Sequence, residues 1–304
     1  MKSSIVILPL EKIDYNKWNA CVAANSNGLI YAYSYYLNAM SNKWFGVIIN
    51  DYETIFPIPV KQKFSIQYAY TPAFTQQLGF IGNTKNITNE VIKAIQNFIK
   101  YGSFNINFFT TDIAEKLAAK PLNNFIIHLN NSFASIQKKY KKTMAYSLSK
   151  ANKQHFSYLE SNNIKEALLL YKAYNKNNLL HVTATDYTNF HKLLLQLQSQ
   201  ENIIIRKVVN KENELMSIAL LMKDNKRYYN ILNTTTEAGR KTEANYFLYN
   251  KILQELSNQK MIFDFEGSDL LGVKKFYEKF GAINQPYFLW HYNVLPKPIK
   301  WLKK

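Results

Sequence analysis

The order of strands and helices in the first part of the chain recurs in the second part, and this recurrence constrains the fold more than any other feature. A strand hairpin, a third strand, a helix, a further strand and a final strand follow one another twice, at an offset of about 150 to 165 residues. A fixed period of this size is the pattern that structural duplication produces, although sequence identity between the copies is not evident. We therefore expect an α/β (α+β) fold with two similar halves, 1–132 and 133–304, each a mixed twisted sheet flanked by helices.

Two kinds of pattern predict the elements: alternating β-branched and aromatic residues predict strands, and apolar residues three and four apart predict helices. The clearest helix is 90–99, where Val91 and Ile95 share one face and Thr88 or Asn89 begins the helix. The expected strands are 3–9, 44–49, 53–60, 64–70, 104–110 and 125–129 in the first half, and 203–209, 215–222, 227–233, 261–265 and 287–294 in the second. The other expected helices lie around 164–171, 187–197, 243–256 and 273–280.

A lysine-rich segment, 130–153, joins the halves. It holds four lysines between Lys138 and Lys142 and lacks proline and glycine, so it predicts a basic helix and not a flexible linker. This helix is either a solvated surface or a wall of a ligand groove that attracts an anionic substrate.

The charge of the chain points to anionic ligands without selecting one. Lys and Arg number 38 against 21 Asp and Glu, a formal net charge of +17, and such a positive field attracts polyanions. Arginine, which recognises phosphates and bases in a bidentate geometry, stands only at positions 206, 227 and 240. Coenzyme A is therefore as compatible with the charge as a nucleic acid.

Several classes of site and location are not supported. Cys21 is the only cysteine, which excludes an intramolecular disulfide and a multi-cysteine metal site and fits a reducing compartment. The five histidines lack the spacing of a zinc site, so we expect no metal, and no glycine-rich phosphate loop or nucleophile elbow occurs. No uncharged apolar run approaches the roughly 18 residues of a membrane span, and the first apolar stretch is shorter than a signal-peptide core, so we expect a cytoplasmic protein.

The run 261–282 has the most specific pattern in the chain. A buried strand ends in Asp264 and Glu266, which strand alternation places on one face. Two glycines then allow a tight loop before a short helix, which Gly281 is suited to end.

The segment Phe-Tyr-Glu-Lys-Phe-Gly-Ala at 276–282 resembles the FYEKLGF ending of the GNAT acyltransferases. Together with Asp-Phe-Glu-Gly-Ser at 264–268 and the doubled architecture, it makes the chain similar to the tandem GNAT-fold proteins, which include FemAB-type aminoacyl transferases and CelD-like acyltransferases. The resemblance covers most of the chain as element order and is specific over 227–282. It implies an N-acyltransferase that moves an acyl group from acetyl-CoA or another acyl-CoA to an amine acceptor in a groove between two GNAT-like halves.

The resemblance also implies where the donor binds. GNAT enzymes hold pantetheine and pyrophosphate where the central strand parts from its neighbour and the next helix begins, because unpaired amides and the helix dipole favour phosphate there. The family pattern (Gln/Arg)-x-x-Gly-x-(Gly/Ala) is kept only at its first glycine, and a polar loop that caps a helix is the alternative reading. The donor-binding residues would be Asn233, Thr234, Thr235, Thr236, Gly239, Arg240, Lys241 and Thr242.

Three residues are candidate catalytic groups. Tyr277 matches the tyrosine that protonates the departing thiolate in many GNAT enzymes, and a phenol with a pKa of about 10 can act as such an acid. Glu266 or Asp264 would take a proton from the incoming ammonium, and Glu266 lies nearer the open end of the strand. The alternatives are an aromatic core position for Tyr277 and a structural tie for Asp264.

The loop 70–82 presents amides and a ring without charge, which suits a polar acceptor, and it looks like a wall of the acceptor groove of related tandem proteins. An ordinary connection that packs on the sheet is the alternative. The substrate-binding residues would be Phe74, Thr75, Gln76, Gln77 and Ser268.

Two other functions stay open. A FemAB-like transferase would take aminoacyl-tRNA as donor and offer the basic segment 138–153 to the tRNA. A catalytically degenerate GNAT pair would act as a binding module, a view that the altered loop pattern favours. The sequence predicts neither the acceptor nor the oligomeric state.

Overall fold

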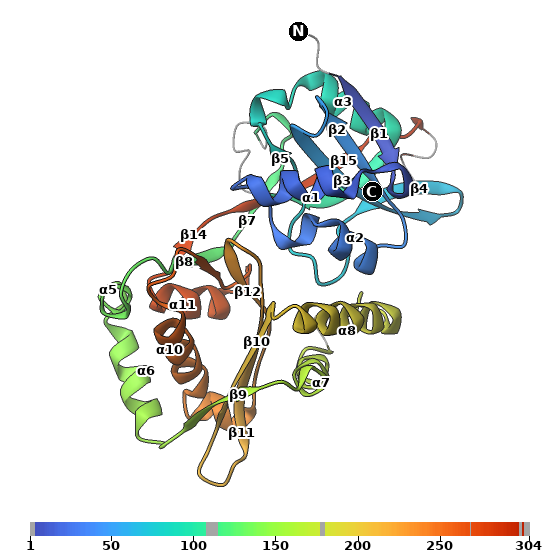
Figure 1. Cartoon of the computed structure of the whole chain (residues 1–304). Coiled ribbons are helices and arrows are strands. Elements are labelled where there is room, and N and C mark those ends of the chain that lie inside the picture. The colour runs from blue at the N-terminus through green and yellow to red at the C-terminus, as the bar shows by residue number, and fades with distance from the viewer. Residues whose placement is uncertain (1–3, 108–114, 177–179, 268, 298–299, 301–304) are drawn as a thin grey trace. The chain divides into compact units, whose positions relative to one another are not determined.

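The computed structural model describes residues 4–107, 115–176, 180–267, 269–297 and 300 (Figure 1). They form two compact units. Unit 1 is the chain up to Leu122 together with the part from Pro286 on, and unit 2 is Asn123–Gln285.

Unit 1 is built on a mixed sheet with the strand order β1-β2-β3-β4-β6-β15-β7, in which β5 also pairs with β3. Helix α3 buries Val91 and Ile95 in a core that includes Phe56 and Trp290. Thr88 accepts a hydrogen bond from the Val91 amide at 3.4 Å, so the predicted helix and its start are confirmed. The strands are β1 (Ile5–Pro9), β2 (Trp44–Ile49), β3 (Thr54–Lys63), β4 (Ile66–Tyr70), β5 (Ile81–Gly82), β6 (Tyr101–Ile106), β7 (Lys120–Leu122) and β15 (Tyr287–Asn293), and the α-helices are α1 (Tyr15–Ala24), α2 (Ser34–Met40) and α3 (Asn89–Phe98).

Unit 2 is built on a second mixed sheet, with the order β14-β8-β13-β12-β11-β10-β9. Helix α10 packs on one face and buries Ala244, Leu248, Ile252 and Leu256, the four-residue series in the sequence, while α7 and α8 lie on the other face (Figure 1). The strands are β8 (Phe125–His128), β9 (Ser157–Ser161), β10 (Ile203–Val209), β11 (Leu215–Lys223), β12 (Arg227–Thr235), β13 (Ile262–Asp264) and β14 (Ile283–Asn284). The helices are α5 (Phe133–Gln137), α6 (Thr143–Asn152), α7 (Ile164–Tyr174), α8 (Ala184–Ser199), α9 (Glu237–Lys241), α10 (Ala244–Leu256) and α11 (Leu271–Lys279).

The expected repeat of topology is present. In unit 1 the strand after the hairpin β2–β3 is β4, and it runs parallel to β6, the strand that follows helix α3. In unit 2 the strand after the hairpin β10–β11 is β12, and it runs parallel to β13, the strand that follows helix α10. The prediction of an α/β fold with two mixed sheets flanked by helices is therefore confirmed.

The two copies exchange their final strands. Strand β8 follows the first copy in sequence but pairs with β13 of unit 2, and β15 follows the second copy but pairs with β6 of unit 1. The halves expected from element order, 1–132 and 133–304, would each have kept their own final strand. The compact units consequently have other bounds, and unit 1 contains both ends of the chain.

The lysine-rich segment is not one helix. Helices α5 and α6 flank a turn that contains Lys138–Lys142, so the expectation of a continuous basic helix is wrong. The end of α11 holds this turn, because the Lys141 amide donates to the Lys279 carbonyl at 2.9 Å. Gly281 has φ +69, and a Cβ there would lie 2.4 Å from the Lys139 carbonyl oxygen, so only glycine fits this close approach.

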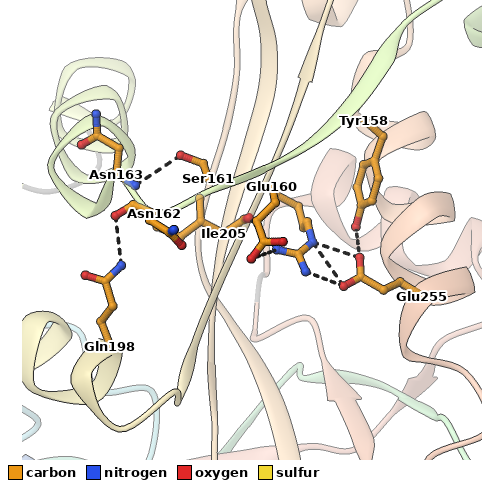
Figure 2. Close-up of polar contacts among 9 residues, drawn as sticks. Tyr158, Glu160, Ser161, Asn162, Asn163, Gln198, Ile205 and Glu255 are labelled. Carbon is orange, nitrogen blue, oxygen red and sulfur yellow. Dashed lines mark hydrogen bonds and ion pairs between the residues drawn. The ribbon is translucent and has the colours of Figure 1, made fainter.

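The edge strand β9 of unit 2 and its neighbour β10 are tied to α10 through Glu255. Figure 2 shows Tyr158 directed at this carboxylate, to which its hydroxyl donates at 2.5 Å. Arg206 of β10 donates to the same carboxylate at 2.6 Å. Although burial opposes the effect, these two donors lower the pKa of Glu255.

In the part of the chain that the structure describes, no helix combines the length and the apolar character that crossing a membrane requires.

Candidate functional site

Strands β12 and β13 are joined at one end and separate at the other. Strand β12 pairs with β11 up to Thr235, but it pairs with β13 only over Arg227–Tyr229. Residues 230–235 therefore have no strand partner on that side among the described residues. The predicted parting of two strands near residue 233 is confirmed.

A bulge in β12 gives the physical cause of this parting. Leu232 lies opposite Leu220 and Tyr229 lies opposite Met222, so β12 carries one extra residue between these two pairs. An extra residue bends the strand and increases its local twist, which turns β12 away from β13 beyond this point.

A cavity of about 360 Å³ lies beside the unpaired stretch of β12. Thr234 is one of its lining residues, and the Thr234 hydroxyl oxygen is buried and has no hydrogen-bond partner in the described structure. The lining residues come from α7 (Tyr174, with Asn175), β12 (Asn233, Thr234, Thr235), α9 (Gly239, Arg240), the start of α10 (Glu243, Asn245) and α11 (Val273, Phe276).

The amides expected to be bare in the 236–242 loop already have acceptors. The Gly239 amide donates to the Thr236 hydroxyl at 3.0 Å, and the Arg240 amide donates to the Thr236 carbonyl at 2.9 Å. The Thr242 amide donates to the Ala238 carbonyl at 3.1 Å. Thr236 thus caps the short helix α9 with its own side chain, and the expectation of bare amides at these three positions is wrong.

Gly239 is required by packing. A Cβ at this position would lie 2.0 Å from the carbonyl oxygen of Met216 in β11. The absence of a side chain at Gly239 therefore lets α9 approach the sheet backbone closely.

The two cations of the loop have different surroundings. Arg240 lines the cavity, donates from Nη1 to the Thr235 carbonyl at 2.8 Å and lies over the Tyr174 ring at 5.9 Å. Lys241 instead forms an ion pair with Glu237 at 2.8 Å, and both of these side chains are about three-quarters exposed. Arg240 is thus the loop cation that lines the cavity.

Asp264 is held in a buried network. Its carboxylate accepts from Arg227 at 2.8 Å and from the Asn124 side chain at 3.3 Å, and the Asp264 side chain is 1% exposed. Burial raises the pKa of this carboxyl, against the opposing effects of Arg227 and the Glu266 amide. These contacts agree with the structural tie named above as the alternative for Asp264.

Glu266 lies just beyond β13 in a left-handed conformation, with φ +67. Its amide donates to Asp264 at 3.0 Å. Because the strand ends at Asp264, strand alternation does not extend to Glu266, and the expectation that both carboxylates share a strand face is wrong.

Tyr277 lies on α11 with its ring 4.6 Å from that of Phe265. Burial first, and then the charge of Glu266, raise the pKa of this phenol above its usual value. Tyr171 of α7 also feels the charge of Glu266, and burial, Tyr187 and Glu266 in that order raise its pKa to about 12. The charge of Glu266 thus acts on two phenols, Tyr277 and Tyr171, whereas the sequence predicts Tyr171 only as part of an apolar helix face.

The predicted acceptor loop belongs to unit 1 and bonds largely within that unit. The Phe74 carbonyl accepts from the Tyr36 hydroxyl, and the Gln76 carbonyl accepts from the Asn105 side chain at 2.7 Å. Thr75 and Gln77 are buried. This packing agrees with the alternative of a connection that packs on its sheet, and Ser268 lies outside the described residues.

No group of three or more potential ligand side chains that could hold a metal ion occurs among the residues that the structure describes.

Comparison with known proteins identifies the fold. No protein-family profile matches the chain, and no curated protein matches it by sequence. Among solved structures, FemX is similar over 100% of both chains with 12% identity and a TM-score of 0.66. The C-terminal domain of a lysylphosphatidylglycerol synthetase from Agrobacterium fabrum is similar over 95% of this chain and 93% of its own, with 11% identity and a TM-score of 0.55. A GCN5-related N-acetyltransferase from Sphaerobacter thermophilus is similar over 96% of each chain, with 7% identity and a TM-score of 0.50. The chain thus has the GNAT-like two-half fold that the sequence predicted.

Proposed function

We propose that the chain is an N-acyltransferase, which holds an acyl donor in the cavity of unit 2 and moves the acyl group to an amine. The observation that carries this proposal is the parting of β12 from β13 beside the cavity. An unpaired strand edge offers N–H and C=O groups to an extended, amide-containing ligand. The names of the structural neighbours, an N-acetyltransferase and a lysylphosphatidylglycerol synthetase among them, support the reaction class.

The chemistry needs a base, an acid and close placement of the reactants. Glu266 takes the proton of the incoming ammonium, so that the neutral amine attacks the acyl carbonyl carbon. The bond to the leaving oxygen or sulfur then breaks, and the Tyr277 hydroxyl protonates that atom. The second proton that the attacking nitrogen must lose to become an amide returns the Tyr277 phenolate to the phenol. A phenol with its ordinary pKa of about 10 is already protonated at neutral pH and can give this proton. Burial raises the pKa of Tyr277 and so makes it a weaker acid. Asp264 holds the Glu266 amide and so fixes the base.

The donor is either an acyl-CoA, the first expectation from the resemblance, or an aminoacyl-tRNA. The 236–242 loop is not prepared to bind a pyrophosphate. The Gly239 and Arg240 amides already donate hydrogen bonds within the loop, and Lys241 forms an ion pair with Glu237.

Donor binding and turnover test the proposal together. Acetyl-CoA, a longer acyl-CoA and charged tRNA are each incubated with the protein and a panel of small amines, and the acylated amine is measured against a protein-free control. We expect one donor class to support transfer, and tRNA retention to fall steeply with salt if that donor is aminoacyl-tRNA. Absence of transfer from every donor would contradict the proposal.

A non-catalytic binding module is the second candidate function. It is favoured by the 236–242 loop, in which the Gly239 amide already donates its hydrogen bond to the Thr236 hydroxyl. In that case a donor binds, and no amine is acylated.

A further inference from the structure

Strands β3 and β4 continue beyond the sheet of unit 1 as a two-stranded ribbon. Strand β3 pairs with β2 only up to Pro59, and β4 pairs with β6 only at Ala69 and Tyr70. Within the described structure, the segments 61–63 and 66–68 therefore have only each other as strand partners. Figure 1 shows this ribbon extending from unit 1 beside the label β4. The end of the ribbon is consequently open to an external partner.

The turn of the ribbon carries an exposed aromatic residue, Phe64. It is 87% exposed, the largest fraction of any large apolar residue in the part of the chain that the structure describes. Phe64 and Ser65 form a two-residue turn between the paired residues Lys63 and Ile66, with φ 48 and φ 64. Such a turn favours asparagine and glycine, and an aromatic residue is unfavourable in the left-handed region. Since the requirements of the turn do not explain the ring, it points to a role outside the fold.

Two exposed lysines accompany the ring, and no acidic residue lies near it in sequence. Lys61 and Lys63 are two residues apart in β3, so they share one face of the ribbon. The Lys63 Nζ lies 5.6 Å from the centroid of the Phe64 ring. No Asp or Glu occurs between Glu53 and Glu90. The end of the ribbon thus combines one apolar ring with two cations whose charge no carboxylate of this segment neutralises.

We propose that the end of this ribbon binds the surface of an anionic lipid bilayer, with Phe64 inserted below the headgroups and Lys61 and Lys63 at the lipid phosphates. An inserted ring gains free energy by leaving water, and lysines bury their carbon stems while their ammonium groups stay at the charged surface.

The small size of the contact favours a bilayer over a protein partner. A stable protein interface buries more than about 1,000 Å², which one ring and two lysines cannot supply. A bilayer accepts a single side chain, and two weak signals of this kind produce reversible binding.

Sedimentation of the full chain with lipid vesicles tests the proposal. The vesicles consist of phosphatidylcholine, either alone or with one-third phosphatidylglycerol. We expect binding to the anionic vesicles that falls with added salt, and much weaker binding to the neutral ones. Phe64→Asn removes the ring and suits the left-handed turn, so it is expected to fold at least as stably as the wild type. Its binding to anionic vesicles is expected to be at least about 10-fold weaker.

Matched variants are needed because the net charge of +17 attracts the whole chain to any anionic surface. The double change Lys61→Gln and Lys63→Gln is expected to weaken binding by about 30-fold, since each lysine near the surface contributes about 1 kcal/mol. The double change Lys85→Gln and Lys93→Gln lowers the charge equally at exposed positions outside the ribbon, and binding is expected to fall by less than about 3-fold. Leu180→Ser removes an 86% exposed apolar residue of unit 2 and is expected to leave binding unchanged.

Insertion of the ring is measured with Phe64→Trp and vesicles whose acyl chains carry bromine, which quenches tryptophan fluorescence at contact. The variant is expected to be quenched more strongly than the wild type.

Four results would each overturn the inference: no binding to anionic vesicles, unchanged binding in Phe64→Asn, equal losses in the two lysine pairs, or no additional quenching in Phe64→Trp. The vesicle assays contain neither donor nor amine, so their result is independent of the proposed function.

Discussion

Arg227 and Asp264 form a buried ion pair, 2.8 Å long, between the first residue of β12 and the last residue of β13. Their side chains are 3% and 1% exposed. The pair fixes the end at which the two strands meet, while the bulge separates them further along, so it sets the position of the opening beside the cavity.

Asp264→Asn is expected to destabilise the protein, because it leaves the Arg227 charge buried without a counterion. The cost of breaking a buried pair in this way is about 3–5 kcal/mol of unfolding free energy. Urea unfolding measures it. The exposed Lys241–Glu237 pair is the matched control, since Lys241→Gln is expected to cost under about 1 kcal/mol. Equal effects of the two changes would contradict the structural role of the buried pair.

Gly239 and Gly272 are expected to respond oppositely to substitution by alanine. At Gly239 a Cβ meets the Met216 carbonyl, so α9 must move, and overpacking of this kind costs about 1–3 kcal/mol. At Gly272, in the first turn of α11, a Cβ meets nothing within 4 Å, and alanine is expected to stabilise by about 0.4–1 kcal/mol. Thermal and urea unfolding of both variants check the signs, and a neutral Gly239→Ala would show that the loop packs less closely than described.

Glu266→Gln is expected to lower turnover by about 100-fold or more while donor binding changes little, because a general base typically contributes 10²–10⁴-fold. Single-turnover kinetics and donor titration separate the two effects. Glu278→Gln, on the α11 side bonded to Lys141, serves as the control carboxylate and is expected to keep its turnover. Wild-type turnover in Glu266→Gln would remove Glu266 from the mechanism.

The substitution Tyr277→Phe distinguishes a role of Tyr277 as the acid from a role in aromatic packing alone. The phenylalanine ring keeps the contact with Phe265, so the unfolding free energy is expected to change by less than about 1 kcal/mol. Turnover is expected to fall by about 100-fold, since the proton for the leaving group is lost. A stable variant with unchanged turnover would leave Tyr277 with the aromatic packing role alone.

The hydrogen bonds to Glu255 make the unfolding free energy of the protein depend on pH in the acid range. Its folded-state pKa lies below the unfolded value, so its contribution is present at neutral pH and is lost as pH falls below about 4.3, through the folded-state pKa. Glu255→Gln is therefore expected to destabilise the protein at pH 7 and to lose much of that effect near pH 3. Unfolding curves at both values test this. Glu160→Gln, a 70% exposed neighbour 3.6 Å from Arg206, is expected to show little change at either pH.

Local sequence was sufficient to predict the helices and strands whose apolar residues recur with a strong period. The buried series of α3 and α10 and the cap at Thr88 follow from spacing, because one helix face must be apolar to be buried. Helices α1 and α2 were not predicted from the sequence. Helix α1 mixes Asn and Lys with its buried residues Trp18 and Val22, so its apolar spacing is weak.

The candidate site was located by sequence only in outline. The strand end, the following loop and the glycine at 239 could be named because they are consecutive in the chain and match a known pattern. Tyr171 could not be recognised, since the influence of Glu266 on it depends on how α7 packs in unit 2. The sequence predicted a loop that caps a helix only as the alternative to an open phosphate site, because the two have the same local composition, and the Thr236 hydroxyl bears out that alternative.

The sequence by itself determined the order of strands and helices, their repetition and the faces that are buried, because these depend on spacing along a single segment. Only the tertiary structure decided that β8 pairs in unit 2 and β15 in unit 1. The alternation of apolar and polar residues determines which face of a strand is buried. It does not determine which strand pairs with it, since backbone hydrogen bonds are the same for every sequence. The buried Arg227–Asp264 pair and the cavity beside β12 follow from the pairing of β12 with β13 over Arg227–Tyr229 alone.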